Sequence, residues 1–92
     1  MKNIKICVIG LGYIGLPLSL AFDKYFKVIG YDTNQTRVNE LKKYFDRNFQ
    51  CSKNVLKKKK KLKITFDEKK IKNFNFFIIT VPTPINKNKT PN

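Results

Sequence analysis

The segment that decides the fold of this chain reads IKICVIGLGYIG and occupies residues 4–15. Its first half is apolar and rich in strand-forming residues, which predicts a buried strand. Three glycines follow. Gly10 allows a sharp turn from strand to helix, Gly12 leaves the backbone open to a close approach, and Gly15 lets the next helix lie against the strand. The spacing predicts a glycine-rich turn between a strand and a helix.

A second apolar run ends on Asp32, twenty-two residues after Gly10. Pro17 favours a helix that begins near Tyr13 or Ile14, because proline is tolerated in the first turn of a helix. Such a helix points free N–H groups and the positive end of its dipole at the turn, where a pyrophosphate can bind. A carboxylate at the end of the second strand can accept hydrogen bonds from ribose hydroxyls. The whole unit therefore predicts a dinucleotide site.

The choice between NAD and NADP depends on Asp32 and Arg37. A carboxylate at position 32 would repel a 2′-phosphate, which favours NAD. Arg37 is the complication, since an arginine nearby could pair with that phosphate. With the acid in place we expect NAD.

Strand and helix patterns alternate along the rest of the chain. We expect strands over residues 3–9, 27–31, 62–66 and 74–81. We expect helices over 13–24, directly after Asn34 and over 53–60, with one or two helical turns over 67–72. Asn34 and Ser52 are predicted N-caps. Val38, Leu41 and Phe45 form a predicted buried stripe, and Val55 and Leu56 are predicted to face inward.

This alternation predicts an α/β fold, a Rossmann-like doubly wound parallel sheet that is partial, with about four strands. The doubly wound order places the fourth strand beside the first. The glycine turn would then face residues 81–84 across a ligand crevice, with Thr83 as the best-placed polar residue. The strand over residues 76–81 would be an exposed apolar edge, which invites aggregation.

Composition points to few other functions. The net charge is +14 and there is no histidine, so a basic module that binds nucleic acid or another polyanion is an alternative. The lysine run over residues 57–61 is better explained as a solvated helix face, because no zinc-finger or RNA-binding signature accompanies it. A non-functional remnant is a further alternative. Nucleic acid is an unlikely partner on this reading.

The two cysteines do not form a disulfide framework. Cys7 is expected to be a small buried apolar residue, and Cys51 lies in a polar connection without a partner motif. No signal peptide is recognisable, and no segment has the roughly twenty apolar residues that cross a bilayer. We expect a cytoplasmic protein without a membrane partner.

Three stretches resemble the UDP-glucose/GDP-mannose dehydrogenase family, which are UDP-sugar 6-dehydrogenases. They are residues 5–17, the pair Asp46-Arg47 followed by Ser52, and residues 76–85, which read FFIITVPTPI. The last stretch is most similar to the branch that acts on UDP-N-acetylhexosamines. The resemblance spans essentially all 92 residues but only about the first quarter of the family's length.

The resemblance implies an oxidoreductase that uses NAD to oxidise the C6 alcohol of a UDP-sugar to a uronic acid for surface polysaccharides. It places the backbone amides of Tyr13 and Ile14 at the pyrophosphate. It also places Asp32 at the adenosine ribose, Arg37 beside the adenosine, and Thr83 against the cofactor. Together with Gly10, Gly12 and Gly15, these are the predicted cofactor-binding residues; another NAD dehydrogenase with the same opening is disfavoured by residues 81–84.

The same resemblance implies that residues 1–92 are an incomplete N-terminal NAD-binding domain. The family's nucleophilic cysteine stands in a Gly-Gly-x-Cys context that neither Cys7 nor Cys51 has. No catalytic or metal-binding residue is predicted, and the catalytic and C-terminal UDP-sugar-binding domains are expected to be absent. The chain alone is predicted to be inactive, whereas the full-length form would be a homo-oligomer.

Overall fold

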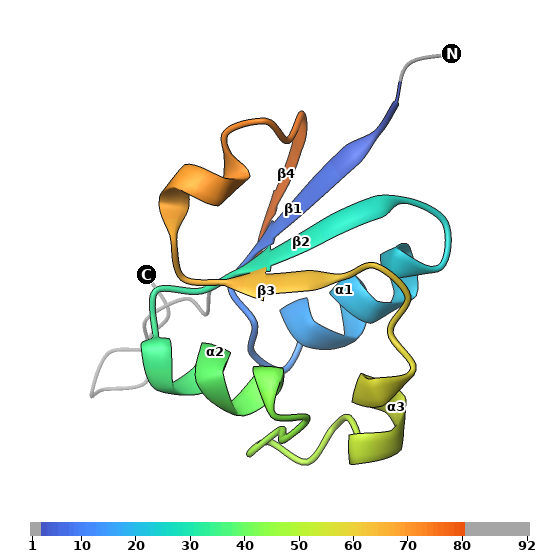
Figure 1. Cartoon of the computed structure of the whole chain (residues 1–92), viewed down its shortest axis with the longest axis vertical. Helices are drawn as coiled ribbons and strands as arrows, with labels where there is room; N and C mark the ends of the chain where they lie inside the picture. Colours follow the sequence, from blue (N-terminus) through green and yellow to red (C-terminus); the bar gives the residue numbers. More distant parts are fainter. Residues whose placement is uncertain (1–2, 81–92) are drawn as a thin grey trace, which may run out of the picture.

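The computed structural model describes residues 3–80, whose strands form one parallel sheet (Figure 1). In chain order the elements are β1 (Lys5–Ile9), α1 (Gly15–Asp23), β2 (Lys27–Tyr31), α2 (Gln35–Lys42), α3 (Lys53–Lys57), β3 (Lys63–Thr65), the 3-10 helix η1 (Glu68–Ile71) and β4 (Phe76–Ile79). The strand order is β3-β2-β1-β4, and every pairing is parallel. This order confirms the predicted Rossmann-like fold, with the fourth strand beside the first.

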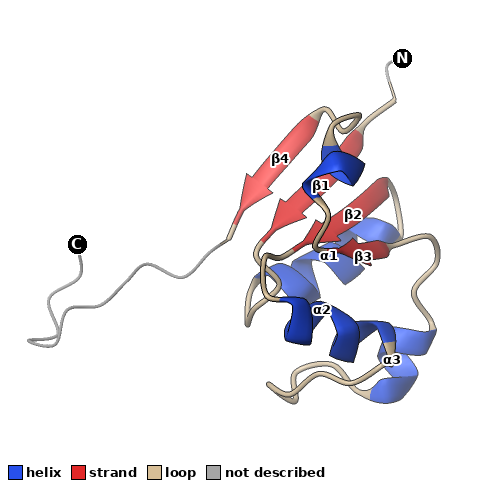
Figure 2. Cartoon of the chain, turned by 60° about the vertical axis from the view of Figure 1, so that its left-hand side comes forward, coloured by secondary structure: helices blue, strands red, loops and turns tan. Residues whose placement is uncertain are grey.

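Helices α1 and α2 cover one face of the sheet, whereas the segment from β3 to β4, which includes η1, passes over the other face (Figures 1 and 2). The main apolar cluster joins Ile6 and Val8 of β1 to Leu16 of α1 and Leu41 of α2. Cys7, between the first two, is fully buried, as predicted. Within residues 3–80, no helix has the length and apolarity needed to cross a bilayer.

Three short polar side chains act as N-caps, each accepting a hydrogen bond from a backbone N–H in the first turn of its helix. Asn34 accepts a hydrogen bond from the N–H of Arg37 at 3.1 Å, and Ser52 accepts one from Val55 at 3.2 Å, so both predicted N-caps are confirmed. The carboxylate of Asp67 caps η1 in the same manner. These caps fix where the helices begin after β2, the polar connection and β3.

Two predicted core positions are wrong. Phe45 is about half exposed because α2 ends at Lys42 and Tyr44 turns the chain with a φ of 66°. Tyr44 packs against the core instead. Val55 is exposed because α3 has only five residues and Leu56 occupies its single buried position. The Phe45 error comes from extending a helical period past the end of α2, whereas the Val55 error comes from assigning two adjacent residues to the buried side of a short helix that buries one.

The carboxylate of Asp23, at the end of α1, anchors the loop that leads into β3. It accepts hydrogen bonds from the backbone N–H groups of Lys60 and Lys61, and the residue is 5 % exposed. This contact ties the lysine-rich segment after α3 to the helix layer through its backbone. The lysine side chains themselves are not needed for it.

Strand β4 forms the edge of the sheet beyond β1. Among the described residues its apolar side chains are largely bare, with Phe76 54 %, Phe77 46 % and Ile79 68 % exposed. The expected exposed apolar edge is therefore present over Phe76–Ile79. Thr83 and the rest of residues 81–92 lie outside the described part of the chain.

Candidate cofactor site

The glycine turn is built by hydrogen bonds between the ends of β1 and β2 and by a close helix contact. Gly10 has a φ of 99°, a conformation that favours glycine, and its N–H donates to the carbonyl of Tyr31 at 2.8 Å. A Cβ on Gly15 would lie 1.7 Å from the carbonyl oxygen of Gly10, whereas a Cβ on Gly12 would meet nothing within 4 Å. The turn thus requires glycine at positions 10 and 15 and stays open at position 12.

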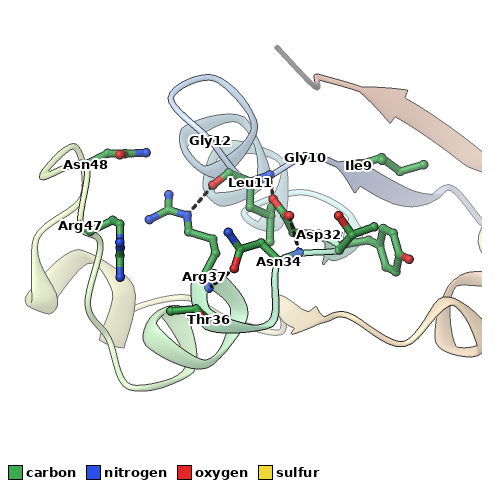
Figure 3. A pocket seen from close by; sticks show the side chains of 12 residues that line it. Ile9, Gly10, Leu11, Gly12, Asp32, Asn34, Thr36, Arg37, Arg47 and Asn48 are labelled. Carbon is green, nitrogen blue, oxygen red and sulfur yellow. Dashed lines mark hydrogen bonds between the residues drawn. The ribbon is translucent and has the colours of Figure 1, made fainter. Parts of the chain in front are cut away.

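Asp32 lies directly after β2 and points at this turn (Figure 3). Its Oδ2 accepts a hydrogen bond from the N–H of Leu11 at 2.9 Å, and its Oδ1 accepts one from Asn34 at the same distance. Each carboxylate oxygen has a further lone pair for a ligand hydroxyl. Asp32 is therefore fixed in orientation and retains the capacity to accept hydrogen bonds.

A pocket of about 640 Å³ opens at the carboxyl ends of β1 and β2, and both the turn and Asp32 line it. This is the edge at which ligands bind to open α/β sheets. Helix α1 begins beside it without a side-chain cap: Ile14 occupies the N-cap position and makes no such bond. The side chains of Tyr13 and Ile14 are exposed. Uncapped N–H groups at a helix start suit an anionic ligand.

Arg37 holds the other side of Leu11 (Figure 3). Its Nε donates to the carbonyl of Leu11 at 2.7 Å, and its Nη1 donates to Oδ1 of Asp46 at 2.7 Å. Its Nη2 is buried and has no hydrogen-bond partner among the described residues. Because Asp32 binds the N–H of Leu11 and Arg37 binds its carbonyl, these two side chains flank one residue of the turn.

Asp46 is a supporting residue whose role sequence reasoning missed. Besides Arg37, it accepts hydrogen bonds from the N–H groups of Asn48, Gln50 and Cys51 at 2.9–3.0 Å. Burial pushes the pKa of Asp46 upward, but these hydrogen bonds, that from Arg37 foremost, outweigh it and hold the pKa below its usual range. The ionised carboxylate therefore organises the connection between α2 and α3.

Thr80 is a second residue that the sequence did not single out. It directly follows β4, and its hydroxyl donates to the carbonyl of Gly10 at 2.7 Å, with a longer contact to Ile9. Its oxygen would lie 2.5 Å from a Cβ on Gly15. Thr80 thus closes the turn from the β4 side. A hydroxyl at the end of the strand that borders the switch point is the signal that could have found it.

The described residues offer little for other chemistry. Within residues 3–80, no three histidine, cysteine, aspartate or glutamate side chains gather as metal ligands. Burial raises the pKa of the Cys7 thiol to about 11, so it is a poor nucleophile.

A larger groove of about 980 Å³ lies around the amino ends of β1, β2 and β3, where its lining includes Lys5, Lys24, Lys27, Lys60, Lys61 and Lys63. This groove is separate from the glycine turn.

Comparison with known proteins places this geometry in a family. The model of the UDP-glucose/GDP-mannose dehydrogenase family, NAD binding domain, matches residues 4–92. The chain is 48 % identical over 91 residues to the UDP-N-acetyl-D-glucosamine 6-dehydrogenase of Salmonella typhi, covering 99 % of this chain and 21 % of that protein. It is 43 % identical over 91 residues to the enzyme of the same name from Pseudomonas aeruginosa, covering 99 % and 22 %.

Solved structures agree with the sequence comparison. The UDP-D-ManNAc dehydrogenase of Pyrococcus horikoshii superposes with a TM-score of 0.85 at 32 % identity, over 97 % of this chain and 22 % of that one. The chain spans about a fifth of the length of the curated relatives it matches. The cofactor of the matched domain is NAD, as predicted. The chain therefore belongs to the UDP-glucose/GDP-mannose dehydrogenase family, in which it corresponds to the NAD-binding domain.

Proposed function

We propose that this chain binds NAD at the pocket beside the glycine turn, as the N-terminal part of an enzyme that oxidises the C6 alcohol of a UDP-N-acetylhexosamine to a uronic acid. The observation that carries the proposal is the bond between Asp32 and the N–H of Leu11. It sets an acceptor for ribose hydroxyls beside an open turn and an uncapped helix start.

The proposed contacts follow the pocket. The amides of Tyr13 and Ile14 and the open backbone at Gly12 would face the pyrophosphate, with Gly10 and Gly15 shaping the turn. Asp32 would bind the adenosine ribose. Arg37 would border the adenosine, and Thr83 remains a predicted contact from the segment after β4.

The substrate class rests on similarity. The relatives from Salmonella typhi and Pseudomonas aeruginosa are both named for UDP-N-acetyl-D-glucosamine, and a 43 % identical relative from Staphylococcus aureus is Protein CapL. The catalytic and sugar-binding parts would belong to the portion of these relatives that the chain does not match. The enzyme would act in the cytoplasm as a homo-oligomer and supply surface polysaccharide synthesis.

Ligand binding by the 92-residue chain tests the cofactor site. Titration with NAD, followed by calorimetry or NMR, should give saturable binding that Asp32→Ala weakens about tenfold, corresponding to ~1.4 kcal/mol. Asp67→Ala is the matched control, because Asp67 also binds a backbone N–H but lies outside the pocket. Equal affinity in the two variants contradicts the proposal.

A chimera tests the enzyme class. Residues 1–92 would replace the matching segment of the Salmonella typhi relative, and NADH formation would be followed with UDP-N-acetylglucosamine, UDP-N-acetylmannosamine and UDP-glucose. We expect turnover with an N-acetylated substrate, loss of turnover with Asp32→Ala, and none from the 92-residue chain alone. A folded chimera that binds NAD but oxidises no UDP-sugar contradicts the proposed place of this chain in a UDP-sugar dehydrogenase and leaves the cofactor site standing.

A further inference from the structure

Two arginines line the proposed NAD pocket together with Asp32. They are Arg37, at the start of α2, and Arg47, in the connection after it (Figure 3). An arginine in this part of a dinucleotide site is what accommodates the 2′-phosphate of NADP. The sequence favours NAD because of Asp32, but it does not show how either guanidinium is held.

The Arg37 guanidinium is already bound by groups of the protein. It forms an ion pair with Asp46 at 2.7 Å in which the two side chains are 8 % and 1 % exposed, and its Nε is bonded to the carbonyl of Leu11. Its Nη2 lacks a hydrogen-bond partner within residues 3–80, but that atom is shielded from solvent. A phosphate could reach the guanidinium only by displacing Asp46 or the chain around it.

Arg47 is also paired, but less securely. Its Nε and Nη2 face the two carboxylate oxygens of Glu40, and its side chain is 57 % exposed. An exposed pair is easily exchanged for solvent or another anion. The buried pair therefore restrains its guanidinium more strongly than the exposed pair does. Glu40, which pairs with the exposed arginine, is the matched control for Asp46.

The charges around the ribose end follow from these pairs. Arg37 and Asp46 cancel, as do Arg47 and Glu40, which leaves Asp32 as the uncompensated charge among these five side chains. Asp32 and the Arg37 guanidinium hydrogen-bond to the two backbone groups of the same residue, Leu11. A guanidinium released from Asp46 would therefore lie near the ribose that Asp32 is proposed to bind.

We propose that Asp46 is a specificity-determining residue for the coenzyme: by holding the Arg37 guanidinium in a buried ion pair, it leaves the Asp32 charge to reject a 2′-phosphate. The inference rests on the proposed NAD site. Asp46 acts through Arg37 and does not itself touch the ligand. Its role is separate from its hydrogen bonds to Asn48, Gln50 and Cys51, which shape the connection.

The test compares two ligands that differ only in the 2′-phosphate and occupy only the adenosine half of the site. Binding of 5′-AMP and 2′,5′-ADP (adenosine 2′,5′-bisphosphate) to the 92-residue chain is measured by calorimetry or NMR. The unaltered chain should prefer 5′-AMP. Asp46→Asn should shift the ratio of the two affinities about tenfold toward 2′,5′-ADP, whereas Glu40→Gln should shift it no more than about twofold.

A double variant separates specificity from folding. Arg37→Met combined with Asp46→Asn removes both charges, so it leaves no unpaired charge in the interior and is the variant expected to fold where Asp46→Asn does not. Its affinity ratio should equal that of the unaltered chain. A selective loss of 2′,5′-ADP binding in the double variant means that Arg37 already reaches the phosphate, which overturns the proposal.

The remaining outcomes distinguish the two proposals. An unaltered chain that prefers 2′,5′-ADP, or a folded Asp46→Asn variant with an unchanged ratio, overturns the role of Asp46 while leaving a nucleotide site in place. An unaltered chain that binds neither ligand overturns the proposed NAD site and this inference with it.

Discussion

The glycine turn and the edge strand β4 are neighbours, yet they differ in how far the described residues bond and cover them. In the turn, both backbone groups of Leu11 and both of Gly10 have hydrogen-bond partners. On β4, Phe76, Phe77 and Ile79 are all about half exposed or more. Residues 3–80 therefore supply the hydrogen-bond partners that shape the turn, whereas they leave the side chains of the neighbouring strand uncovered.

Gly15→Ala should break the turn most severely. The new Cβ would lie 1.7 Å from the backbone oxygen of Gly10 and 2.5 Å from the Thr80 hydroxyl, so the helix and the turn must separate. We expect a loss of about 3 kcal/mol in the free energy of unfolding, the upper part of the range for overpacking. Urea denaturation measures it.

Gly12→Ala is the control for this prediction, because a Cβ there meets nothing within 4 Å. Its stability should change by less than about 1 kcal/mol, while the methyl group obstructs the proposed pyrophosphate position and weakens NAD binding. Equal stabilities of the two variants would show that the close contact at Gly15 is not what holds the turn.

The next largest effect is expected from acid, which protonates Asp46 and weakens its bond to Arg37. The pKa of Asp46 is lower in the folded chain than the value of about 3.9 for a free side chain. Its contribution to stability is therefore fully present above about pH 5 and is lost as the pH falls through the folded pKa. Urea midpoints between about pH 6 and 3 should fall less steeply for the double variant Arg37→Met, Asp46→Asn. Parallel pH profiles would contradict this assignment.

Thr80→Val acts where the two regions meet. It removes the hydroxyl that donates to the Gly10 carbonyl while keeping the shape of the side chain, so we expect a loss of about 1 kcal/mol. Thermal unfolding should show a decrease of roughly 4–8 °C. Thr80→Ser keeps the donor and should recover most of this decrease. A valine variant as stable as the serine variant would show that the bond contributes nothing.

Ile79→Lys should have the smallest effect on stability and should sharpen the contrast. Because Ile79 is 68 % exposed, the free energy of unfolding should change by no more than about 0.5 kcal/mol. The added charge on an edge strand should reduce self-association, measured by analytical ultracentrifugation over a concentration series. Val55→Lys, on α3, is the control and should leave association unchanged. Equal effects of both variants would indicate a general charge effect.

Much of the fold follows from local sequence. Gly10, Gly15 and Asp32 have spacings set by the strand-turn-helix-strand unit itself, and Asn34 and Ser52 cap helices through bonds only three residues long. Phe45 was misplaced because periodicity does not reveal where a helix ends, and Val55 because it does not reveal how few positions a short helix buries. The position of Asp32 beside the turn was predictable because the same strand-turn-helix-strand unit sets its spacing from the glycines.

The rest of the site depends on contacts that only the folded chain creates. The Thr80 hydroxyl reaches a carbonyl 70 residues away. Asp46 reaches Arg37 across the end of α2, where Tyr44 turns the chain with a φ of 66°. No local pattern distinguishes Asp46 from a polar surface residue, and Thr80 is marked only by its place at the end of the strand that borders the switch point. Thr83 lies outside the described residues, so its role stays a prediction.

The aspartates carry a consequence for how this sequence can vary. Asp23, Asp32, Asp46 and Asp67 each accept hydrogen bonds from backbone N–H groups, although the chain has 20 basic residues against 6 acidic ones. None of these bonds requires a lysine side chain. Surface lysines can therefore be gained or lost without removing these contacts, which depend on four carboxylates and on backbone N–H groups.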